Sequence, residues 1–289
     1  MPYTRDTEIV QHLKPEPMTG AEQAAQDSID DLDFEIFQHK MNMIALEGKE
    51  TTMKLGASTG MRWGDVAFGV YTAAGDLSVV ATGIWFHAVL GQIPVKYIVK
   101  HWLGDETVGV RPGDSFFFND PFYAGVHAAD MGLCVPVFAD GELVCFVGAN
   151  VHTGENGSAE PGGQPIAAKS RYEEGLMVPP IKVGENYNLR EDIMTRLGTA
   201  TRDPRTMVLD IKARLAACRI AERRIQDMVK EKGVAFFRGA LRKILATTAK
   251  AARKKVSLLH DGIYRQPRFM DIVGNEEKLI KIGICLEKK

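Results

Sequence analysis

Hydrophobic residues spaced three and four positions apart mark the first regular segment of the chain. Between Ala21 and Gly48 they are Ile29, Leu32, Ile36, Phe37, Met41 and Ile44. This spacing places the apolar side chains on one stripe of an amphipathic helix, which we expect to end near Gly48. Residues 1–20 contain Pro15 and Pro17 and have no periodicity, so we expect them to form an N-terminal arm.

After this helix the pattern changes to short apolar runs separated by turn residues. Residues 65–82, DVAFGVYTAAGDLSVVAT, predict a β-hairpin that turns at AAGD. Residues 131–152, MGLCVPVFADGELVCFVGANVH, predict a second hairpin, because Asp140-Gly141 favours a two-residue type I′ turn. Between the hairpins we expect a helix over residues 93–103, and a core strand at the three phenylalanines 116–118.

The second half of the chain begins with a segment rich in glycine and proline. Residues 153–203 predict a long irregular excursion of the kind that often carries function. Asp203-Pro204 is a helix-start signal, and we expect one long helix from there to Lys232 and another over residues 235–259. The final segments GIYRQPRFMDIV and KLIKIGICLEKK predict two strands.

Composition and charge narrow the class of protein. The chain has 289 residues, of which 45% are hydrophobic and 25% charged, and its formal net charge is -1. These values are typical of a globular protein, and they favour neither a nucleic acid nor an acidic membrane as a partner. We find no apolar run of about 18 residues and no secretory leader, so we expect a cytoplasmic protein without a membrane partner.

Two features of this composition have alternative interpretations. The predicted helix over residues 235–259 is rich in lysine and arginine; a solvated or subunit-facing surface is favoured over a phosphate or nucleic-acid site. The four cysteines form no CxxC pair, and we expect buried free thiols. They are Cys134, Cys145, Cys218 and Cys285.

The stretch FYAGVHAADMGL carries His127 and Asp130 three positions apart, just before the second hairpin. With Asp140-Gly141 as the turn, Ala139 lies opposite Glu142, and the same register sets Ala129 opposite His152. Residues opposite or diagonal across a strand pair share a face, so His127 and His152 are expected to lie close together. This register sets Asp130 opposite Val151, pointing away from His127, so the chain must bend or bulge to bring all three together.

Two imidazoles and a carboxylate suit Zn²⁺, Mn²⁺ or Fe²⁺ acting as a Lewis acid. The alternative is a histidine hydrogen-bonded to the backbone beside an aspartate that caps a turn. The residue spacing by itself leaves both interpretations open.

Further candidates surround these three residues. Asp65 is a possible fourth metal ligand or the end of a turn, and His87 is a catalytic candidate or a core histidine among aromatic residues. Glu155, in HTGENG, is a candidate general base or an ordinary loop glutamate. The glycines of PGG (161–163) lack the strand, helix and lysine of a phosphate loop, so we predict no nucleotide site in this chain.

At these residues the sequence resembles the hydantoinase B / oxoprolinase family. The resemblance rests on GDVAFGVYTAAGDL, NDPFYAGVHAADM, VPVFADGELVCFVGANVH, EPGG and EEGLMVPPIKVGE, in that order. Within the family, VHTGENGSAEPGGQPIAAKSRYEEG and IKVGENYNLRED are most similar to the α subunits of acetone carboxylase and related ketone carboxylases. The hydrolase branch usually reads closer to HxxDVGGxxPGS after the second histidine.

The resemblance implies an α+β fold, in which antiparallel hairpin-rich sheets pack with long helices. It implies a divalent metal, Mn²⁺ before Zn²⁺ or Fe²⁺, held by His127, Asp130 and His152, with Asp65 as a further ligand. We expect His87 or Glu155 to handle protons.

The resemblance also implies partners and a reaction. ATP with Mg²⁺ is expected in a hydantoinase-A-like β subunit, and a small γ subunit completes the assembly. The implied reaction joins the enolate of a small ketone to CO₂ or bicarbonate and gives a β-keto acid. The alternatives are ATP-dependent opening of a hydantoin, lactam or 5-oxoproline ring, and a scaffold module without activity.

Family α subunits are more than twice as long as this chain. We therefore expect a divided or partial subunit that is incomplete at its C-terminus, with final strands that need a partner segment. The expected organisation is an arm (1–20), a metal-binding catalytic α+β domain (21–202), a helical pair (203–260) and the start of a further β region (261–289).

Overall fold

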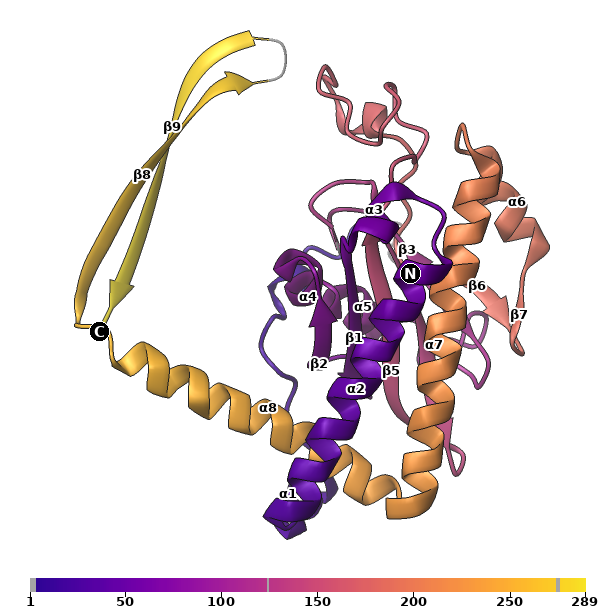
Figure 1. Cartoon of the computed structure of the whole chain (residues 1–289), viewed down its shortest axis with the longest axis vertical. Coiled ribbons are helices and arrows are strands. Elements are labelled where there is room, and N and C mark those ends of the chain that lie inside the picture. The colour runs from indigo at the N-terminus through magenta and orange to yellow at the C-terminus, as the bar shows by residue number, and fades with distance from the viewer. Residues whose placement is uncertain (1–3, 124, 274–275) are drawn as a thin grey trace.

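An antiparallel sheet of seven strands forms the centre of the protein. The computed structural model describes residues 4–123, 125–273 and 276–289. The strand order is β2-β1-β5-β4-β3-β6-β7, and every neighbouring pair is antiparallel (Figure 1). The strands are β1 (Val66–Thr72), β2 (Leu77–Thr82), β3 (Ser115–Phe118), β4 (Asp130–Ala139), β5 (Glu142–His152), β6 (Ile181–Glu185) and β7 (Asn188–Leu189).

Helices cover both faces of this sheet. They are η1 (Ile9–Gln11), α1 (Gly20–Ser28), α2 (Asp31–Leu55), α3 (Thr59–Trp63), α4 (Trp85–Leu90), α5 (Gln92–His101), η2 (Arg171–Glu174), α6 (Glu191–Thr199), α7 (Pro204–Lys232) and α8 (Val234–Ser257). The long helices α2 and α7 pack on one face together with the first turns of α8. Helix α5 and η1 pack on the other face. The predicted α+β fold of antiparallel hairpins and long helices is confirmed.

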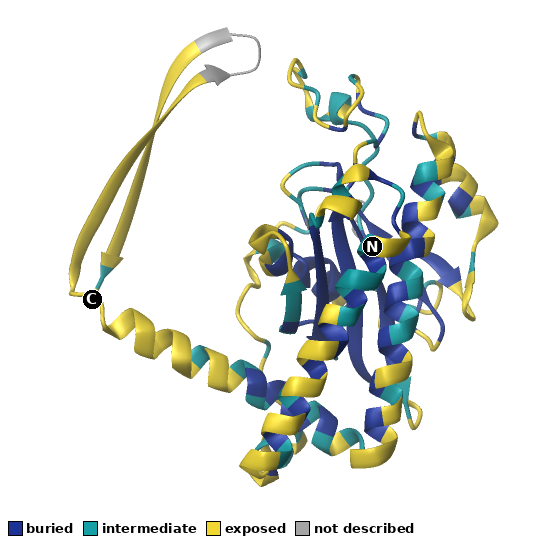
Figure 2. Cartoon of the chain, viewed as in Figure 1, coloured by how far each residue is buried: buried dark blue, intermediate teal, exposed yellow. Residues whose placement is uncertain are grey.

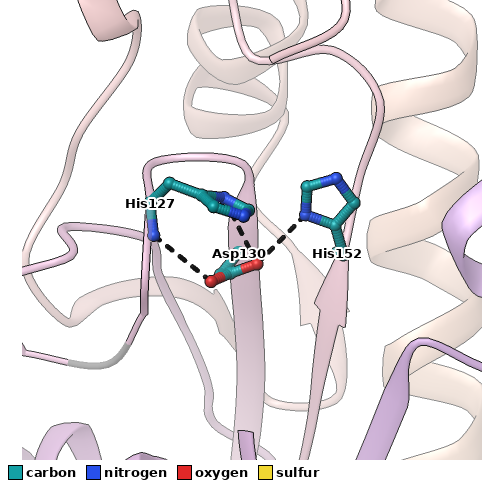
Figure 3. Close-up of side chains that lie close together, drawn as sticks. All are labelled: His127, Asp130 and His152. Carbon is teal, nitrogen blue, oxygen red and sulfur yellow. Dashed lines mark hydrogen bonds and ion pairs between the residues drawn. The ribbon is translucent and has the colours of Figure 1, made fainter. Parts of the chain in front are cut away.

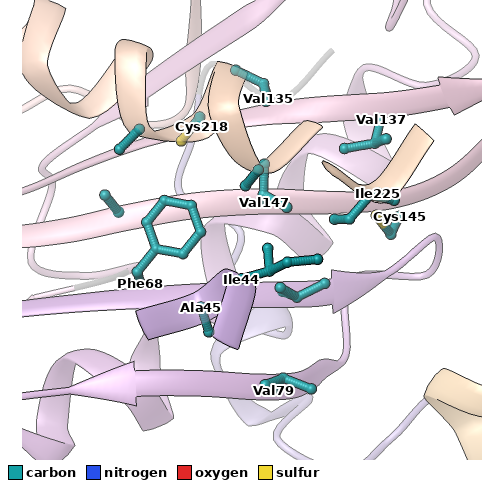
Figure 4. Close-up of a cluster of buried hydrophobic side chains, with 14 of the residues drawn as sticks. Ile44, Ala45, Phe68, Val79, Val135, Val137, Cys145, Val147, Cys218 and Ile225 are labelled. Atoms are coloured by element: carbon teal, nitrogen blue, oxygen red, sulfur yellow. The ribbon is translucent and has the colours of Figure 1, made fainter. Parts of the chain in front are cut away.

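Side chains alternate along β4, so each of them points to one of these two faces. Val135 and Val137 of β4 face the α2 and α7 side, with Val147 of β5 among the same buried cluster (Figure 4). Cys134 and Phe146, at the intervening positions, belong to the core under α5. Because the period is two, every residue of the same parity in β4 shares the face of Cys134.

The predicted single helix over residues 21–48 begins within one residue of α1, but it is wrong in its continuity and at its C-terminal end. Ile29 is extended and Asp30 caps a new helix, its carboxylate accepting from the Asp33 backbone, so α1 and α2 are separate. Helix α2 then continues to Leu55. Gly48 lies inside this helix, at a point where the helix is so close to β1 that a Cβ would come 2.6 Å from the ring of Phe68. That glycine therefore serves close helix–sheet packing rather than a helix end.

The segment 153–203 is less irregular than its composition predicts. It contains η2, the strands β6 and β7, and helix α6. Strand β6 completes the sheet by pairing with β3, a contact between segments more than sixty positions apart. A strand of five residues that is stabilised by such a distant neighbour leaves a weak local signal.

A buried ion network joins α1, the β1–β2 turn, α5 and α8. Asp76 is 1% exposed and accepts from Arg242 at 2.7 Å; Lys96 lies 2.9 Å from the same carboxylate. Arg242 also contacts Glu22 at 3.2 Å. The first basic residues of α8 thus turn inward, while those from Lys250 onward are exposed, so the predicted solvated basic surface holds only for the end of the helix.

Beyond α8, strands β8 (Gly262–Val273) and β9 (Glu276–Lys288) form a hairpin that projects from the rest of the molecule (Figure 1). Its described side chains are largely exposed, among them Phe269, Ile282 and Leu286 (Figure 2). Cys285 is exposed here, so the prediction of four buried thiols is wrong for this cysteine and right for the other three. Within the described ranges, no helix has the length and hydropathy to cross a membrane.

Candidate metal centre

A β-bulge near the hairpin turn sets the register at the candidate site. Asp140 and Gly141 both have positive φ, as a type I′ turn requires, and Ala139 lies opposite Glu142 as predicted. Between Val137 and Phe138 the register then shifts by one residue, so Asp130 lies opposite His152. The predicted pairing of Ala129 with His152 is therefore wrong. Directly opposite residues share a face of the sheet, so Asp130 and His152 point to the same side.

The three candidate ligands converge at the end of this strand pair (Figure 3). Asp130 begins β4, His152 ends β5, and His127 lies in the preceding turn, where its carbonyl accepts from the Asp130 backbone at 3.0 Å. The Nδ1 atoms of His152 and His127 lie 3.1 and 3.4 Å from the same oxygen, Oδ1 of Asp130. One nitrogen or oxygen from each of the three residues falls within 4.8 Å of the others. Two features therefore replace the predicted bend. A turn at residues 127–130 brings His127 to Asp130, and the bulge brings His152 opposite Asp130.

The two carboxylate oxygens of Asp130 have different tasks. Oδ2 accepts hydrogen bonds from the backbone nitrogens of Val126 at 2.7 Å and His127 at 3.3 Å. Oδ1 faces the two imidazoles. The capping interpretation and the ligand interpretation therefore describe different atoms of one side chain, and the cap holds Oδ1 in place toward the histidines.

The donor set suits a divalent cation in charge as well as in position. Burial lowers the pKa of His127 below its ordinary value, which favours the neutral imidazole. Burial raises the pKa of Asp130, but hydrogen bonding to His152 and the nearby imidazoles outweigh it, so this pKa is lowered. Neutral imidazoles and an ionised carboxylate are the forms that bind metal. In addition, Nδ1 of His127 is buried and has no hydrogen-bond partner among the described residues.

The structure pairs Asp65 and His87 beside these three residues. His87, on α4, is 4% exposed, and its Nε2 lies 2.9 Å from Oδ1 of Asp65 and 3.9 Å from Oδ1 of Asp130. The Asn150 side chain donates to the His87 carbonyl at 3.2 Å and so ties α4 to the same face of β5. Asp65 and His87 therefore adjoin the three candidate ligands as a hydrogen-bonded pair.

Glu155 lies in a different environment. Its carboxylate accepts from the Gly157 backbone at 2.6 Å and pairs with Arg202 at 3.3 Å. The structure thus engages Glu155 in contacts of the loop that follows β5, whereas the other five predicted site residues lie together.

Three residues that support the centre carry no recognisable signal in the sequence. Gln164 reaches back to His127, with its side-chain nitrogen 2.8 Å from Nε2. A Cβ on Gly60 of α3 would come 2.1 Å from the carbonyl oxygen of His152, so α3 packs directly on this candidate ligand. Asp210 of α7 accepts from the Ala57 and Ser58 backbones and holds the turn that leads into α3. All three contacts join distant segments, so no local pattern reveals them.

Comparisons with known proteins agree with this architecture. A family model described as Hydantoinase B/oxoprolinase matches residues 30–288. The chain is 36% identical over 279 residues to the acetophenone carboxylase delta subunit of Aromatoleum aromaticum, covering 96% of this chain and 40% of that protein. It is 30% identical over 183 residues to the caprolactamase subunit beta of Pseudomonas jessenii, covering 63% of this chain and 31% of that protein.

A solved structure shows the same arrangement of the chain. The nucleotide-free structure of acetone carboxylase superposes with a TM-score of 0.77 at 27% identity, covering 86% of this chain and 33% of that one. The present chain therefore spans well under half the length of the proteins it matches.

Proposed function

Because the chain belongs to the hydantoinase B/oxoprolinase family, we propose that it is the metal-bearing part of an ATP-dependent ketone carboxylase. The proposed product is a β-keto acid, formed when the enolate of a small ketone joins CO₂ or bicarbonate. The observation that carries this proposal is the convergence of His127, Asp130 and His152 at the end of β4 and β5. The similarity to the acetophenone carboxylase delta subunit over nearly the whole chain supports the ketone as substrate class.

The three ligands would hold a divalent cation, with Mn²⁺ first and Zn²⁺ or Fe²⁺ as alternatives. A cation bound there supplies Lewis acidity, which stabilises negative charge on a substrate oxygen. The chain's own contribution is to fix the donors before binding. The backbone bonds to Oδ2 orient Asp130, and α3 packs on His152, so little reorganisation is needed.

Asp65 and His87 are the proposed proton-handling pair. Asp65 has a side chain 26% exposed, whereas that of His87 is 5% exposed, so substrate reaches the pair from the Asp65 side. A proton taken by the Asp65 carboxylate lies within one hydrogen bond of His87 Nε2, which can share it. Glu155, paired with Arg202, is retained only as a subsidiary candidate in this scheme.

We also propose that ATP and Mg²⁺ bind in a hydantoinase-A-like partner subunit, and that a small third subunit completes the complex. Relatives that are themselves subunits support this assembly. The glycines of PGG have no phosphate-loop context in this chain, which agrees with nucleotide binding elsewhere.

Cyclic amide hydrolysis is the second candidate function. The 30% identity to the caprolactamase subunit beta favours it, because the matched part of that protein also belongs to a ring-opening enzyme. In this case the same three residues would hold a cation that activates water for attack on a lactam, hydantoin or 5-oxoproline ring.

The two functions are separated by turnover assays on the complex reconstituted with its partner subunits. ATP hydrolysis that depends on both a ketone and bicarbonate, with a β-keto acid as product, is the expected result. A complex that opens caprolactam or hydantoin and ignores ketones would instead establish the hydrolase.

The ligand assignment is tested separately by metal analysis of the purified chain. We expect His127→Ala and His152→Ala each to lose most of the bound divalent metal, because each removes one of three ligands. Ile166→Ala, an exposed change in the nearby loop, is the control and should retain it. Undiminished metal content in both histidine variants would place the metal elsewhere.

A further inference from the structure

The outer nitrogen of His127 is held by a residue 37 positions along the chain. The amide nitrogen of Gln164 lies 2.8 Å from Nε2 of His127, the ring nitrogen on the side away from Asp130. The inner nitrogen, Nδ1, faces Oδ1 of Asp130 at 3.4 Å and is buried without a hydrogen-bond partner among the described residues. His127 thus has one nitrogen fixed from outside and one left open toward Asp130 and His152.

Two glycines deliver Gln164 to this position. Gly162 and Gly163 both have positive φ, at 100° and 74°, a conformation that residues with a Cβ rarely adopt. A Cβ on Gly163 would also come 2.9 Å from the Cβ of Ala129, so the loop passes directly over the turn that carries His127. The PGG segment, which lacks the context of a phosphate loop, therefore has a structural role beside the candidate ligand.

The contact with Gln164 can decide which ring nitrogen of His127 carries the hydrogen. A neutral ring carries one proton, so Nδ1 offers its lone pair to a cation only when Nε2 carries the hydrogen. The side-chain amide of glutamine has an acceptor oxygen and a donor nitrogen, which exchange places when the amide turns over. The amide nitrogen faces Nε2 in this structure, and turning the amide over brings its oxygen to the same position. In that orientation Gln164 accepts the Nε2 hydrogen and selects the tautomer whose Nδ1 lone pair faces Asp130 and His152.

We propose that Gln164 is a positioning residue, which orients His127 and selects the tautomer that binds metal through Nδ1. This inference rests on the proposed function only in taking His127, Asp130 and His152 as metal ligands. Gln164 itself touches a ligand and not the metal, so its effect belongs to metal affinity rather than to the chemistry of the substrate.

Zn²⁺ affinity of the purified full-length chain provides the test, measured by competition with a chromophoric chelator. Gln164→Leu, which keeps the bulk and removes the acceptor, should weaken Zn²⁺ binding about 10- to 100-fold. Gln164→Glu supplies a stronger acceptor and should bind at least as tightly as the wild type. Gly163→Ala leaves Gln164 in the sequence but displaces the loop, and should weaken binding like Gln164→Leu.

A second readout distinguishes positioning from a general loss of structure. In ¹⁵N-histidine spectra of the Zn²⁺-loaded wild type, His127 should show a protonated Nε2 and a metal-bound Nδ1. Gln164→Leu should show a mixture of tautomers in the metal-free protein, with thermal unfolding close to the wild type. The exposed Ile166→Ala in the same loop should change neither affinity nor tautomer.

Unchanged Zn²⁺ affinity in Gln164→Leu, or a metal-bound Nε2 on His127, would overturn the inference while leaving the metal centre intact. If His127→Ala and His152→Ala retain the metal, the proposed ligand set fails instead. The two failures are therefore distinguishable in the same series of variants.

Discussion

Residue-level contacts decide which atoms of the centre are available for binding. Asp130 directs one oxygen to backbone nitrogens and the other to two imidazoles, so a single side chain both closes the turn and faces the other two candidate ligands. His152 is supported from behind, because α3 approaches its carbonyl so closely that Gly60 has no room for a Cβ. A side chain that its neighbours already hold in place loses little conformational entropy when it binds a metal.

Gly60→Ala tests this support of His152. The added Cβ would meet the His152 carbonyl oxygen at 2.1 Å, so α3 or the end of β5 must move. We expect a loss of about 1–3 kcal/mol in the free energy of unfolding, together with weaker metal binding. Both are measured by chemical denaturation of the metal-free protein and by chelator competition.

Gly20→Ala is the matched control, since a Cβ there has nothing within 4 Å. It should leave metal affinity unchanged. A Gly60→Ala variant with the stability and metal affinity of the wild type would show that α3 does not support the ligand.

At the scale of elements, the strand register sets the centre, and an ion cluster on α5 holds the N-terminal arm. The bulge between Val137 and Phe138 lies near the hairpin turn, yet it decides which residue faces His152 at the far end of the strands. The arm is fixed on the same side of the sheet by Asp6, whose carboxylate lies 2.7 Å from Lys100 and 2.9 Å from His101 of α5. The same carboxylate accepts hydrogen bonds from the backbone nitrogens of Glu8 and Ile9.

Asp6→Asn should destabilise the protein in a pH-dependent manner. Burial raises the pKa of Asp6, but hydrogen bonds from Lys100 and His101 outweigh it and lower this pKa well below its ordinary value. Because the folded-state pKa is the lower one, the carboxylate stabilises the fold fully above the unfolded value of about 4. This contribution is lost as the pH falls further, toward the folded-state value.

We therefore expect Asp6→Asn to cost about 1–3 kcal/mol at pH 7 and progressively less below about pH 4. Denaturant titrations at pH 7 and pH 3 measure the difference. Asp227→Asn, which removes an exposed pair with Lys230, is the control and should have little effect at either pH. An equal cost for Asp6→Asn at both values would contradict the role of its charge.

At the scale of the whole molecule, the packed sheet and helices contrast with the projecting hairpin. The helices α2 and α7 bury one face of the seven-stranded sheet, and α5 with η1 buries the other. Strands β8 and β9 pair with each other, and their described apolar side chains, such as Phe269, Leu279 and Leu286, remain exposed (Figure 2). Apolar surface of this kind contributes no burial energy to the sheet and favours association.

Removal of residues 261–289 should therefore leave the packed part of the protein intact. We expect its melting temperature to stay within about 4 °C of the full chain, because no core residue lies beyond α8 in the described ranges. Zn²⁺ affinity should be unchanged and solubility higher. Calorimetry and light scattering on the two chains measure these effects, and a larger fall in melting temperature would show that the hairpin supports the core.

Local patterns by themselves determined much of this protein. The alternation and turn residues of 65–82 and 131–152 specified both hairpins, and Asp203-Pro204 specified the start of α7. The resemblance to the hydantoinase B/oxoprolinase family was also correct, and the comparisons confirm it. Such signals are strong because turn conformation and side-chain periodicity depend on neighbouring residues.

Only the tertiary structure decided how the site residues meet. A single bulge changed the partner of Asp130, because a shift of one residue moves a side chain to the other face. Strand β6 and the contact of Gln164 with His127 likewise depend on segments far apart in sequence. The residue types of a site are therefore readable from the chain, whereas their geometry follows from long-range packing that no local pattern encodes.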